Sequence, residues 1–538
     1  MNCKISCSFG EIIDKVTILN IKRQKAKNQE ALFNIQTELR LIENDNPQIK
    51  TKDKLFDVLY ETNLKLWDLE DKIREKSAKK EYDSEYISCA ELIHMTNDLR
   101  YKIKRKINEE YGSLIKEEKI YDDNKSCDFE QLEKGKKLYT NGEYENSMKI
   151  LKPLMKKYQN YPKKDDFYID LLFSFNNICS VFNDDFQYGS IISNIMENID
   201  TLTISKEQKD FCRQNYALFC LSQKRYSQGY NYLNELNIAE RTKELNGKMV
   251  TRYNMSFFKK GDKGKGLLLY NGGGIGDGFM YARFIPIICD KYPENNIILV
   301  SETRTSWIYQ KAFENNNSVT VKKYSDEDIP HFDYHCNVMS LIKYLRYEYE
   351  TIPFTPLFEN LNVKPSLLCK QLLWKIDNNK KSNKIYILNW KGSENNNHEM
   401  KNRRMDLENA IPLFQMENTN WIIVTKDLTQ HENSILDKYE NVKYFGNVVD
   451  INQTYIDTIP MISKMDGVIS TDTSLLHLSA NLNKKTYAML TLGCEWRWTR
   501  REKTTTWYPN VKLFRQQKMG DWSSVVSKLV DELKANIV

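Results

Sequence analysis

Hydrophobic residues recur at helical spacing over the first part of the chain. They follow a Ser8/Glu11 capping-box pair and continue to Leu41, where the run Asn44–Pro47 breaks the pattern. Similar periods predict a second helix over about residues 52–76 and a third over about 86–111. Long helices with charged faces pack as an antiparallel bundle or a short coiled coil. We therefore expect residues 1–121 to form a helical domain.

A second helical segment follows the polar run Asp122–Ser126, which is a candidate linker. Within residues 127–248 the stretch FEQLEKGKKLYTNGEYENSMKILKPLMKKYQNYP resembles a tetratricopeptide repeat, with Gly142 and Tyr144 near the positions of that helix–turn–helix unit. Weaker units follow around Leu171–Ile199 and Asn215–Leu236. Stacked repeats present a curved surface that holds peptides or protein partners, and a plain helical spacer is the alternative.

From Gly266 onward, short apolar runs alternate with helical patterns. A first series comprises GLLLY, NIILVS and Val319–Lys322. After the polar break Asp377–Lys384, a second series comprises IYILN, WIIVT, Val442–Phe445 and Gly467–Ser470. Such alternation predicts parallel sheets covered by helices, and two series predict two facing Rossmann-like domains, at 264–378 and 384–538. The expected fold class is therefore multidomain α and α/β, with a helical bundle, a repeat-like α-solenoid and this pair of domains.

Composition narrows the class of protein. With 538 residues, 41% hydrophobic and 28% charged, the chain can bury several cores. The net charge of +6 comes from interspersed charges, which does not favour nucleic acid as a partner. No apolar run is long enough to span a bilayer, and the start MNCKISCSFGEIIDK lacks the apolar region of a signal peptide. Eleven scattered cysteines without CxxC pairs favour reduced thiols, so we expect a cytoplasmic location.

The segment GVISTDTSLLHLSANL, at 467–482, carries the first chemical indication. A strand is followed by the turn Thr471–Ser474 and a helix with His477 one turn inside it. The start of such a helix offers free N–H groups and a positive dipole end, which suit a phosphate. Asp472, Thr473, Ser474 and His477 are the candidate donor-binding residues. The alternative is that these are ordinary N-cap residues and a structural histidine.

The turn NGGGIGD directly follows the strand GLLLY. Gly273, Gly274 and Gly276 allow close backbone approach, and Asp277 lies at the following helix start. A carboxylate there can act as general base by taking the proton of an attacking hydroxyl. A dinucleotide-binding loop and a simple N-cap remain alternatives. A nicotinamide-binding site usually has an acidic residue at the end of the next strand, about 20 residues further on. Here that strand ends with Val300–Glu302, which does not decide between the alternatives.

Basic residues follow the first strand of the second series, in NWKGSENNNHEMKNRRMD. Lys391, Lys401, Arg403 and Arg404 could neutralise a diphosphate leaving group in place of a metal ion, and a solvated basic loop is the alternative. The acidic triplet Asp326–Asp328 fits a solvated turn, and no His/Cys spacing indicates zinc. We therefore expect no metal and no cofactor.

Two further groups of residues are weaker candidates. Thr425, Lys426, Phe445 and Gly446 follow two strands and could border a base and a ribose, although ordinary strand-end turns would look the same. The run GCEWRWTRREKTTTWYP carries an aromatic and basic cluster made of Trp496, Trp498, Trp507, Arg497, Arg500 and Arg501. It could stack a sugar or a base, with Trp496 and Trp498 in contact, or clamp two domains together.

These motifs carry a family resemblance. Residues 266–535 resemble the heptosyltransferase-like, glycosyltransferase family 9-like group of GT-B enzymes, and tetratricopeptide-repeat proteins that carry such a domain. The matching stretches are GGGIGDGFMYARFIP, DTSLLHL and GCEWRWTRREKTTTWYPNVKLFRQQKMGDWSSVV. In addition, SFGEIIDKVTILNIK resembles a small helical domain appended to sugar-transfer proteins.

The resemblance implies a GT-B fold and a set of roles. Asp277 would be the base, Arg403 and Arg404 would neutralise the donor phosphate, and the residues of 472–474 with His477 would hold the diphosphate and donor sugar. The loop Ser393–Lys401 departs from the family by being longer and rich in asparagine. Heptose transfer is not implied, because no pocket signature identifies the donor or the acceptor.

The sequence therefore predicts an inverting, metal-independent glycosyltransferase. It would move a sugar from a nucleotide-diphosphate sugar to a hydroxyl of a glycan or polypeptide acceptor that the repeats present. The N-terminal helices would serve self-association or a protein partner. Two alternatives remain: a non-catalytic scaffold that keeps a relic GT-B domain, and a nucleotide-sugar epimerase on the same fold.

Overall fold

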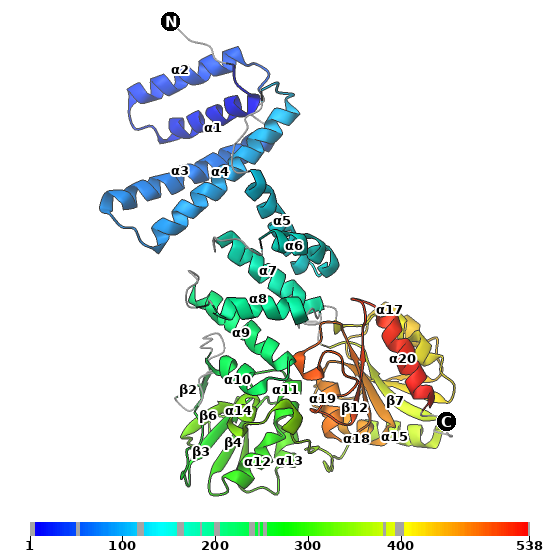
Figure 1. Ribbon diagram of the computed structural model, residues 1–538. Helices are drawn as coiled ribbons and strands as arrows, with labels where there is room; N and C mark the ends of the chain where they lie inside the picture. Colours follow the sequence, from blue (N-terminus) through cyan, green and yellow to red (C-terminus); the bar gives the residue numbers. More distant parts are fainter. Residues whose placement is uncertain are drawn as a thin grey trace. The chain divides into compact units, whose positions relative to one another are not determined.

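The computed structural model divides the chain into two compact units, Met1–Ser126 and Cys127–Val538 (Figure 1). The structure describes residues 6–49, 54–115, 123–158, 166–182, 185–197, 199, 205–235, 243–245, 248–250, 256–379, 383–392 and 403–535.

The first unit consists of the helices α1 (Phe9–Lys25), α2 (Gln29–Asp45), α3 (Lys54–Lys79) and α4 (Ser84–Glu110). Ser8 caps α1 by accepting a hydrogen bond from the N–H of Glu11. The apolar pattern that continues to Leu41 is divided between two helices, a break that the sequence reading did not predict. The break occurs because the backbone is extended at Ala26 and Asn28, and the Asn28 side chain caps α2.

A buried polar cluster joins three helices of this unit. Asp14 of α1 accepts hydrogen bonds from Nε of Arg100 and Nδ2 of Asn63, each at 2.8 Å. Asn63 also donates to Thr17. Because each of these bonds satisfies a buried polar group, the cluster fixes the register of α1 against α3 and α4.

The second unit begins with paired helices. Their bounds are α5 (Asp123–Thr140), α6 (Tyr144–Tyr158), α7 (Asp166–Phe182), α8 (Asp185–Glu197), α9 (Lys206–Ser222) and α10 (Tyr226–Glu235). Residues 123–126, expected to be a linker, begin α5. Gly142 has φ +80° at the turn between α5 and α6, and a Cβ on Gly135 would lie 2.5 Å from Leu151. Glycine is therefore required at both places, while the assignment to tetratricopeptide repeats remains a prediction.

A four-stranded parallel sheet follows a short antiparallel pair, β1 (Lys243–Leu245) with β2 (Lys248–Val250). The sheet has the order β5-β4-β3-β6. Its strands are β3 (Gly266–Tyr270), β4 (Asn296–Ser301), β5 (Val319–Lys323) and β6 (Tyr334–Asn337). The short helices α11 (Ile275–Tyr281), α12 (Phe284–Lys291), α13 (Ser306–Ala312) and α14 (Leu341–Leu345) belong to this sheet (Figure 1).

A six-stranded parallel sheet has the order β12-β11-β10-β7-β8-β9. Its strands are β7 (Lys384–Asn389), β8 (Thr419–Ile423), β9 (Val442–Tyr444), β10 (Gly467–Thr471), β11 (Thr486–Leu490) and β12 (Val511–Arg515). Counted from β7, this is the doubly wound order, in which the sequence of strands reverses between β7 and β10. The predicted parallel α/β architecture is thus confirmed, although the sequence reading did not identify β6, β11 and β12 as strands.

The remaining helices connect these strands. They are α15 (Leu367–Asn379), α16 (Ile411–Phe414), α17 (Gln430–Leu436), α18 (Thr458–Lys464), α19 (Ser474–Asn481) and α20 (Trp522–Ala535), with the 3-10 turns η2 (Val338–Ser340), η3 (Tyr349–Thr351), η5 (Leu407–Ala410) and η6 (Trp496–Trp498). One hydrophobic core runs from α10 through the four-stranded sheet to one face of the six-stranded sheet. Of the helices α5–α10, α9 and α10 contribute residues to this core, whereas α5–α9 pack around a hydrophobic cluster of their own.

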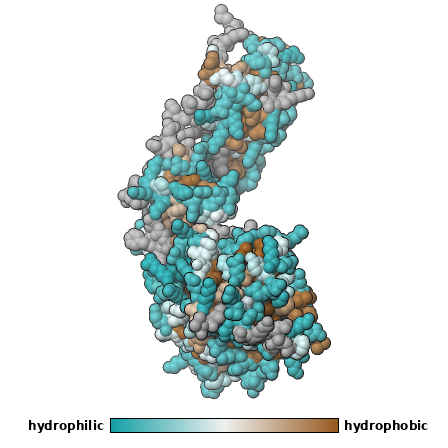
Figure 2. All heavy atoms as spheres, turned by 90° about the vertical axis from the view of Figure 1, so that its right-hand side faces the viewer, coloured by the Kyte–Doolittle hydropathy of each residue, from teal (hydrophilic) through white to brown (hydrophobic). Residues whose placement is uncertain are grey.

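The surface agrees with the mixed composition. On the face drawn in Figure 2, hydrophilic residues predominate and hydrophobic residues appear in small separate areas. Among the described residues, no helix is both long and apolar enough to cross a membrane.

Candidate functional site

The glycine-rich turn after β3 holds the Asp277 carboxylate at the start of α11. Oδ2 of Asp277 accepts a hydrogen bond from the N–H of Gly274 at 2.8 Å. A Cβ on Gly273 would lie 2.4 Å from the same oxygen, so a side chain there would displace the carboxylate. The Asp277 side chain keeps 18% of its surface exposed, which leaves it accessible to a hydroxyl from solvent.

The corresponding turn after β10 leads into α19. Thr473 is the N-cap residue, but its side chain does not cap the helix. Its Oγ1 instead accepts a hydrogen bond from Nδ2 of Asn389, at the end of β7, at 3.2 Å. The hydroxyl of Ser474 pairs with that of Tyr455 at 2.6 Å. This turn therefore lies between β7 and β10, where the strand order reverses and doubly wound sheets bind ligands.

The two turns are in direct contact. A Cβ on Gly276 would lie 2.6 Å from Cδ2 of His477, so the two helices touch where α11 begins. Further along, Nδ2 of Asn481 on α19 donates to the carbonyl of Phe279 on α11 at 3.1 Å. Two segments about 200 residues apart in the sequence, one following a strand of each sheet, therefore lie side by side.

Arg497, in η6, lies on the Asp277 carboxylate. One terminal nitrogen donates to Oδ1 at 2.7 Å, and 11% of the arginine side chain is exposed. Burial alone would lower the pKa of this guanidinium, but the charges of Asp277, Glu495 and Asp472 raise it above its ordinary value. The arginine therefore remains charged, as its pairing with Asp277 requires.

Asp472 and His477 form a second buried pair, with Oδ1 and Nε2 3.6 Å apart. Burial alone would raise the pKa of Asp472, but His477 and the charges of Arg497 and Arg403 hold it below its ordinary value. Burial lowers the pKa of His477 despite the neighbouring carboxylate. At neutral pH the pair is thus an ionised carboxylate beside a neutral imidazole.

The imidazole of His477 is fixed by aromatic neighbours. Its Nδ1 lies 2.9 Å from the hydroxyl of Tyr508, and its ring packs at 5.3 Å from Trp498. With Nε2 facing Asp472, the consistent tautomer has the proton on Nε2 and Tyr508 donating to Nδ1. Trp498 therefore supports His477 and is fully buried, so it does not offer a free face to a sugar.

The basic residues divide into two groups. The buried ammonium of Lys391 contacts Oε2 of Glu432 and the carbonyl of Asp427, each at 2.9 Å. Arg404 approaches the other oxygen of Glu432 at 3.4 Å. Arg403 is close enough to Asp472 to lower the pKa of that carboxyl. Glu432 thus compensates Lys391, and donor binding by Lys391, Arg403 and Arg404 remains a prediction, because residues 393–402 between them lie outside the described residues.

The residues predicted to border a base and ribose lie together at the ends of β8 and β9. Thr425 donates to Oδ1 of Asn389 at 2.9 Å, and a Cβ on Gly446 would lie 2.1 Å from the carbonyl of Thr425. The Lys426 ammonium donates to the carbonyl of Gly446 at 2.7 Å, and burial lowers its pKa. The N–H of Phe445 donates to the carbonyl of Ile423, the last residue of β8. Their contact with a nucleotide remains a prediction.

Trp496 and Trp507 form the interdomain clamp that the sequence left as an alternative. Trp496 packs at 5.5 Å from the ring of Tyr226 on α10. The indole N–H of Trp507 donates to the Tyr226 hydroxyl at 2.8 Å. Beside them, the hydroxyls of Tyr230 and Tyr281 meet at 2.6 Å. The clamp therefore attaches α10 to η6, to the segment between η6 and β12, and to α11.

Sequence reasoning missed several residues of the site. Asn389, Tyr455 and Tyr508 each hold a predicted site residue, but only Asn389 carried a local signal, as the end of the first strand in its series. Arg497 was noticed as part of a cluster and given no role. In the acidic triplet, Asp328 pairs with Lys322, and the described residues hold no group of three or more His, Cys, Asp or Glu placed to bind a metal.

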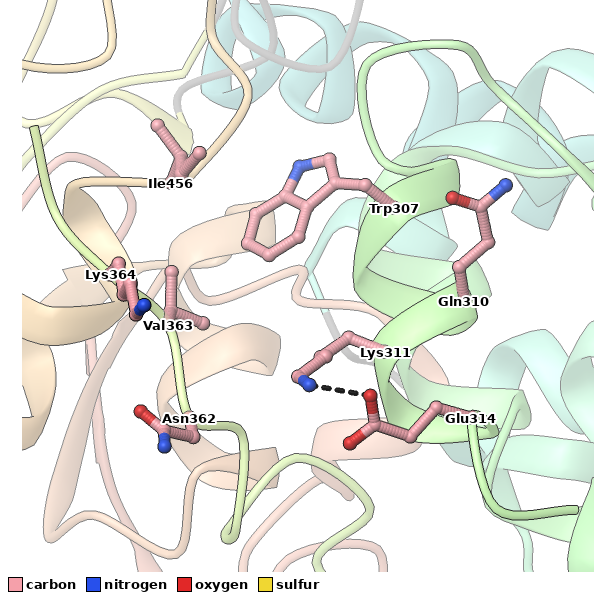
Figure 3. Close-up of a pocket in the computed structure, with 8 residues that line it drawn as sticks. All are labelled: Trp307, Gln310, Lys311, Glu314, Asn362, Val363, Lys364 and Ile456. Atoms are coloured by element: carbon pink, nitrogen blue, oxygen red, sulfur yellow. Dashed lines mark hydrogen bonds and ion pairs between the residues drawn. The ribbon is translucent and has the colours of Figure 1, made fainter.

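A shallow hollow of about 430 Å³ lies elsewhere on this unit (Figure 3). Trp307, Lys311 and Glu314 of the α13 region line one side, and Val363 and Ile456 line the other. None of the predicted site residues is among those that line it.

Comparison with known proteins gives partial matches. Residues 1–132 match the model of a family of unknown function, DUF6165. No curated protein matches the chain.

Solved structures that resemble the chain include a glycosyltransferase family 9 protein from Veillonella parvula DSM 2008, at 10% identity and a TM-score of 0.35. This match covers 51% of the present chain and 97% of the Veillonella protein. The E. coli ADP-heptose LPS heptosyltransferase II matches at 13% identity and a TM-score of 0.34, covering 50% and 98%. The E. coli heptosyltransferase WaaC with ADP matches at 11% identity and a TM-score of 0.31, covering 51% and 100%. At these scores the likeness does not assign an activity, which must come from the residues of this chain.

Proposed function

We propose that the protein is an inverting, metal-independent glycosyltransferase that uses a nucleotide-diphosphate sugar and has a GT-B arrangement of its two α/β domains. The observation that carries the proposal is the contact between the two strand-end turns, Gly276 against His477. It brings an accessible carboxylate beside the start of a helix at the switch point of a doubly wound sheet.

Each turn supplies one half of the proposed reaction. Asp277 would accept the proton of the acceptor hydroxyl as its oxygen forms a bond to the anomeric carbon. The bond from that carbon to the diphosphate would break on the opposite face, and its electron pair would leave with the phosphate. The start of α19 at Ser474 and the charges of Arg403 and Arg404 would stabilise the departing diphosphate.

The test is transfer and donor hydrolysis with a panel of nucleotide-diphosphate sugars, ADP-heptose among them, followed by mass spectrometry. We expect Asp277→Asn to lower the rate about 100- to 10,000-fold, the usual range for loss of a general base. Asp290→Asn is the matched control, since Asp290 is an exposed carboxylate on α12, the helix that follows α11. A wild-type rate in the Asp277→Asn variant would show that the base is another residue.

A further inference from the structure

Arg497 is the one cation seen in direct contact with the proposed base among the described residues. The two oxygens of Asp277 are both engaged by the protein, Oδ2 by the N–H of Gly274 and Oδ1 by Arg497 at 2.7 Å. A hydroxyl that comes to donate its proton to Oδ1 must therefore compete with the guanidinium. The ion pair therefore leaves the carboxylate of Asp277 only partly available to an acceptor hydroxyl.

The guanidinium itself retains unused capacity. Its Nε is buried and has no hydrogen-bond partner among the described residues. Its Cζ lies 5.6 Å from the ring centre of Trp496, which holds one side of it. Since a guanidinium carries five N–H donors in a planar fork, Arg497 can accept an additional anionic ligand without giving up its charge.

The position of Arg497 suggests which anion that would be. Its neighbour in η6, Trp498, packs at 5.3 Å from His477 of α19, and the charge of Arg497 also acts on Asp472, which precedes the N-cap residue Thr473 of that helix. The guanidinium therefore pairs with the carboxylate of one turn and acts electrostatically on the other turn, where the phosphate is expected. A phosphate offers this fork a bidentate partner with more charge than a carboxylate.

We propose that Arg497 is a positioning residue that pairs with Asp277 in the free protein and turns toward the donor's diphosphate when the donor binds. Asp277 is then released for the acceptor hydroxyl only after the donor is in place, and binding is ordered with the donor first. This inference rests on the proposed function, because it assigns the diphosphate to the same site.

Binding of inorganic pyrophosphate to the full-length protein tests the inference, with affinity measured by phosphorus NMR titration or calorimetry. We expect Arg497→Gln to weaken binding about 10- to 100-fold, the value of a hydrogen bond between charged groups. Asp277→Asn should strengthen binding about threefold to tenfold, because it frees the guanidinium. In the double variant, Asp277→Asn should change the affinity of Arg497→Gln by less than about twofold.

Control variants separate this role from general electrostatics and from misfolding. Arg501→Gln removes an exposed arginine of the same loop and should leave pyrophosphate affinity unchanged. Arg497→Lys keeps the charge without the fork and should bind with intermediate affinity, and thermal unfolding confirms that each variant is folded.

Two results would overturn the inference while leaving the proposed function standing. One is an unchanged affinity in Arg497→Gln, which would make the ion pair with Asp277 purely structural. The other is equal strengthening by Asp277→Asn with and without Arg497, which would show a general charge effect. Absence of pyrophosphate binding by the wild-type protein would instead contradict both the inference and the proposed donor site.

Discussion

At the scale of single residues, the site depends on the absence of side chains at the glycine turn. Gly276 touches a His477 ring that Tyr508 and Trp498 hold in place, so the ring has no room to retreat. We expect Gly276→Ala to lower the free energy of unfolding by about 1–3 kcal/mol through overpacking. Urea denaturation measures this, and loss of sugar transfer should accompany it.

A matched control lies two residues earlier in the same turn. A Cβ on Gly274 would find its nearest neighbour, Oδ2 of Asp277, at 3.7 Å, which is an ordinary contact. Gly274→Ala should therefore leave the free energy of unfolding nearly unchanged. Equal destabilisation by both substitutions would mean that the contact between Gly276 and His477 is not tight.

The buried imidazole predicts a pH dependence of stability. Because the pKa of His477 is lowered on folding from 6.5, the unfolded chain binds a proton that the folded protein does not. The stabilisation that comes from keeping His477 neutral in the folded protein is fully present above about pH 6.5. As the pH falls below that value, the free energy of unfolding decreases by up to about 1.4 kcal/mol per pH unit. Thermal unfolding of wild type and His477→Gln between pH 5 and 8 should show a smaller slope in the variant. Parallel slopes would show that another group titrates.

At the scale of elements, α10 is held to α11 by a hydrogen bond between the buried hydroxyls of Tyr230 and Tyr281. Tyr230→Phe leaves the hydroxyl of Tyr281 without its partner and should cost about 1–3 kcal/mol in the free energy of unfolding. The double variant Tyr230→Phe/Tyr281→Phe should cost less than the sum of the single changes. Additive costs in a double-mutant cycle would show that the two hydroxyls do not interact.

The same scale shows what the sequence could and could not predict. The apolar runs GLLLY and IYILN identified β3 and β7 because strands buried on both faces are continuously hydrophobic. Local pattern gave no reason to interrupt the first helix, since the break at Ala26–Asn28 depends on how α2 packs and on the Asn28 cap. The continuously apolar strands were therefore predictable, whereas β6, β11 and β12 and the break between α1 and α2 were not.

The candidate site likewise combines residues that a local pattern identifies with contacts between residues far apart in the sequence. Asp277 and Asp472 each lie at a strand end followed by a helix, which is a local pattern, and the sequence identified both. The pairing of Arg497 with Asp277 joins residues 220 positions apart, so no local spacing could indicate it. The compensation of Lys391 by Glu432 was hidden for the same reason, because the two residues are 41 positions apart.

At the scale of the whole molecule, the helices from Cys127 onward lie in the same compact unit as the α/β part, and α10 joins its core, since Tyr226 packs with Trp496 and Trp507. A fragment of residues 127–538 should fold cooperatively. A fragment that begins at residue 257 would expose this aromatic cluster and should unfold at a lower temperature or aggregate. Equal melting temperatures for the two fragments, measured by calorimetry, would show that α10 does not support the site.

The central claim is that the two strand-end turns form one site for a nucleotide-diphosphate sugar, with Asp277 as its base. The most direct measurement is a crystal structure of the protein with a bound nucleoside diphosphate. The account predicts the terminal phosphate at the first turn of α19, within hydrogen-bond distance of the N–H of Ser474 and on the same side as Asp277. A nucleotide bound elsewhere, such as in the hollow beside Trp307, with the α19 turn vacant, would contradict it.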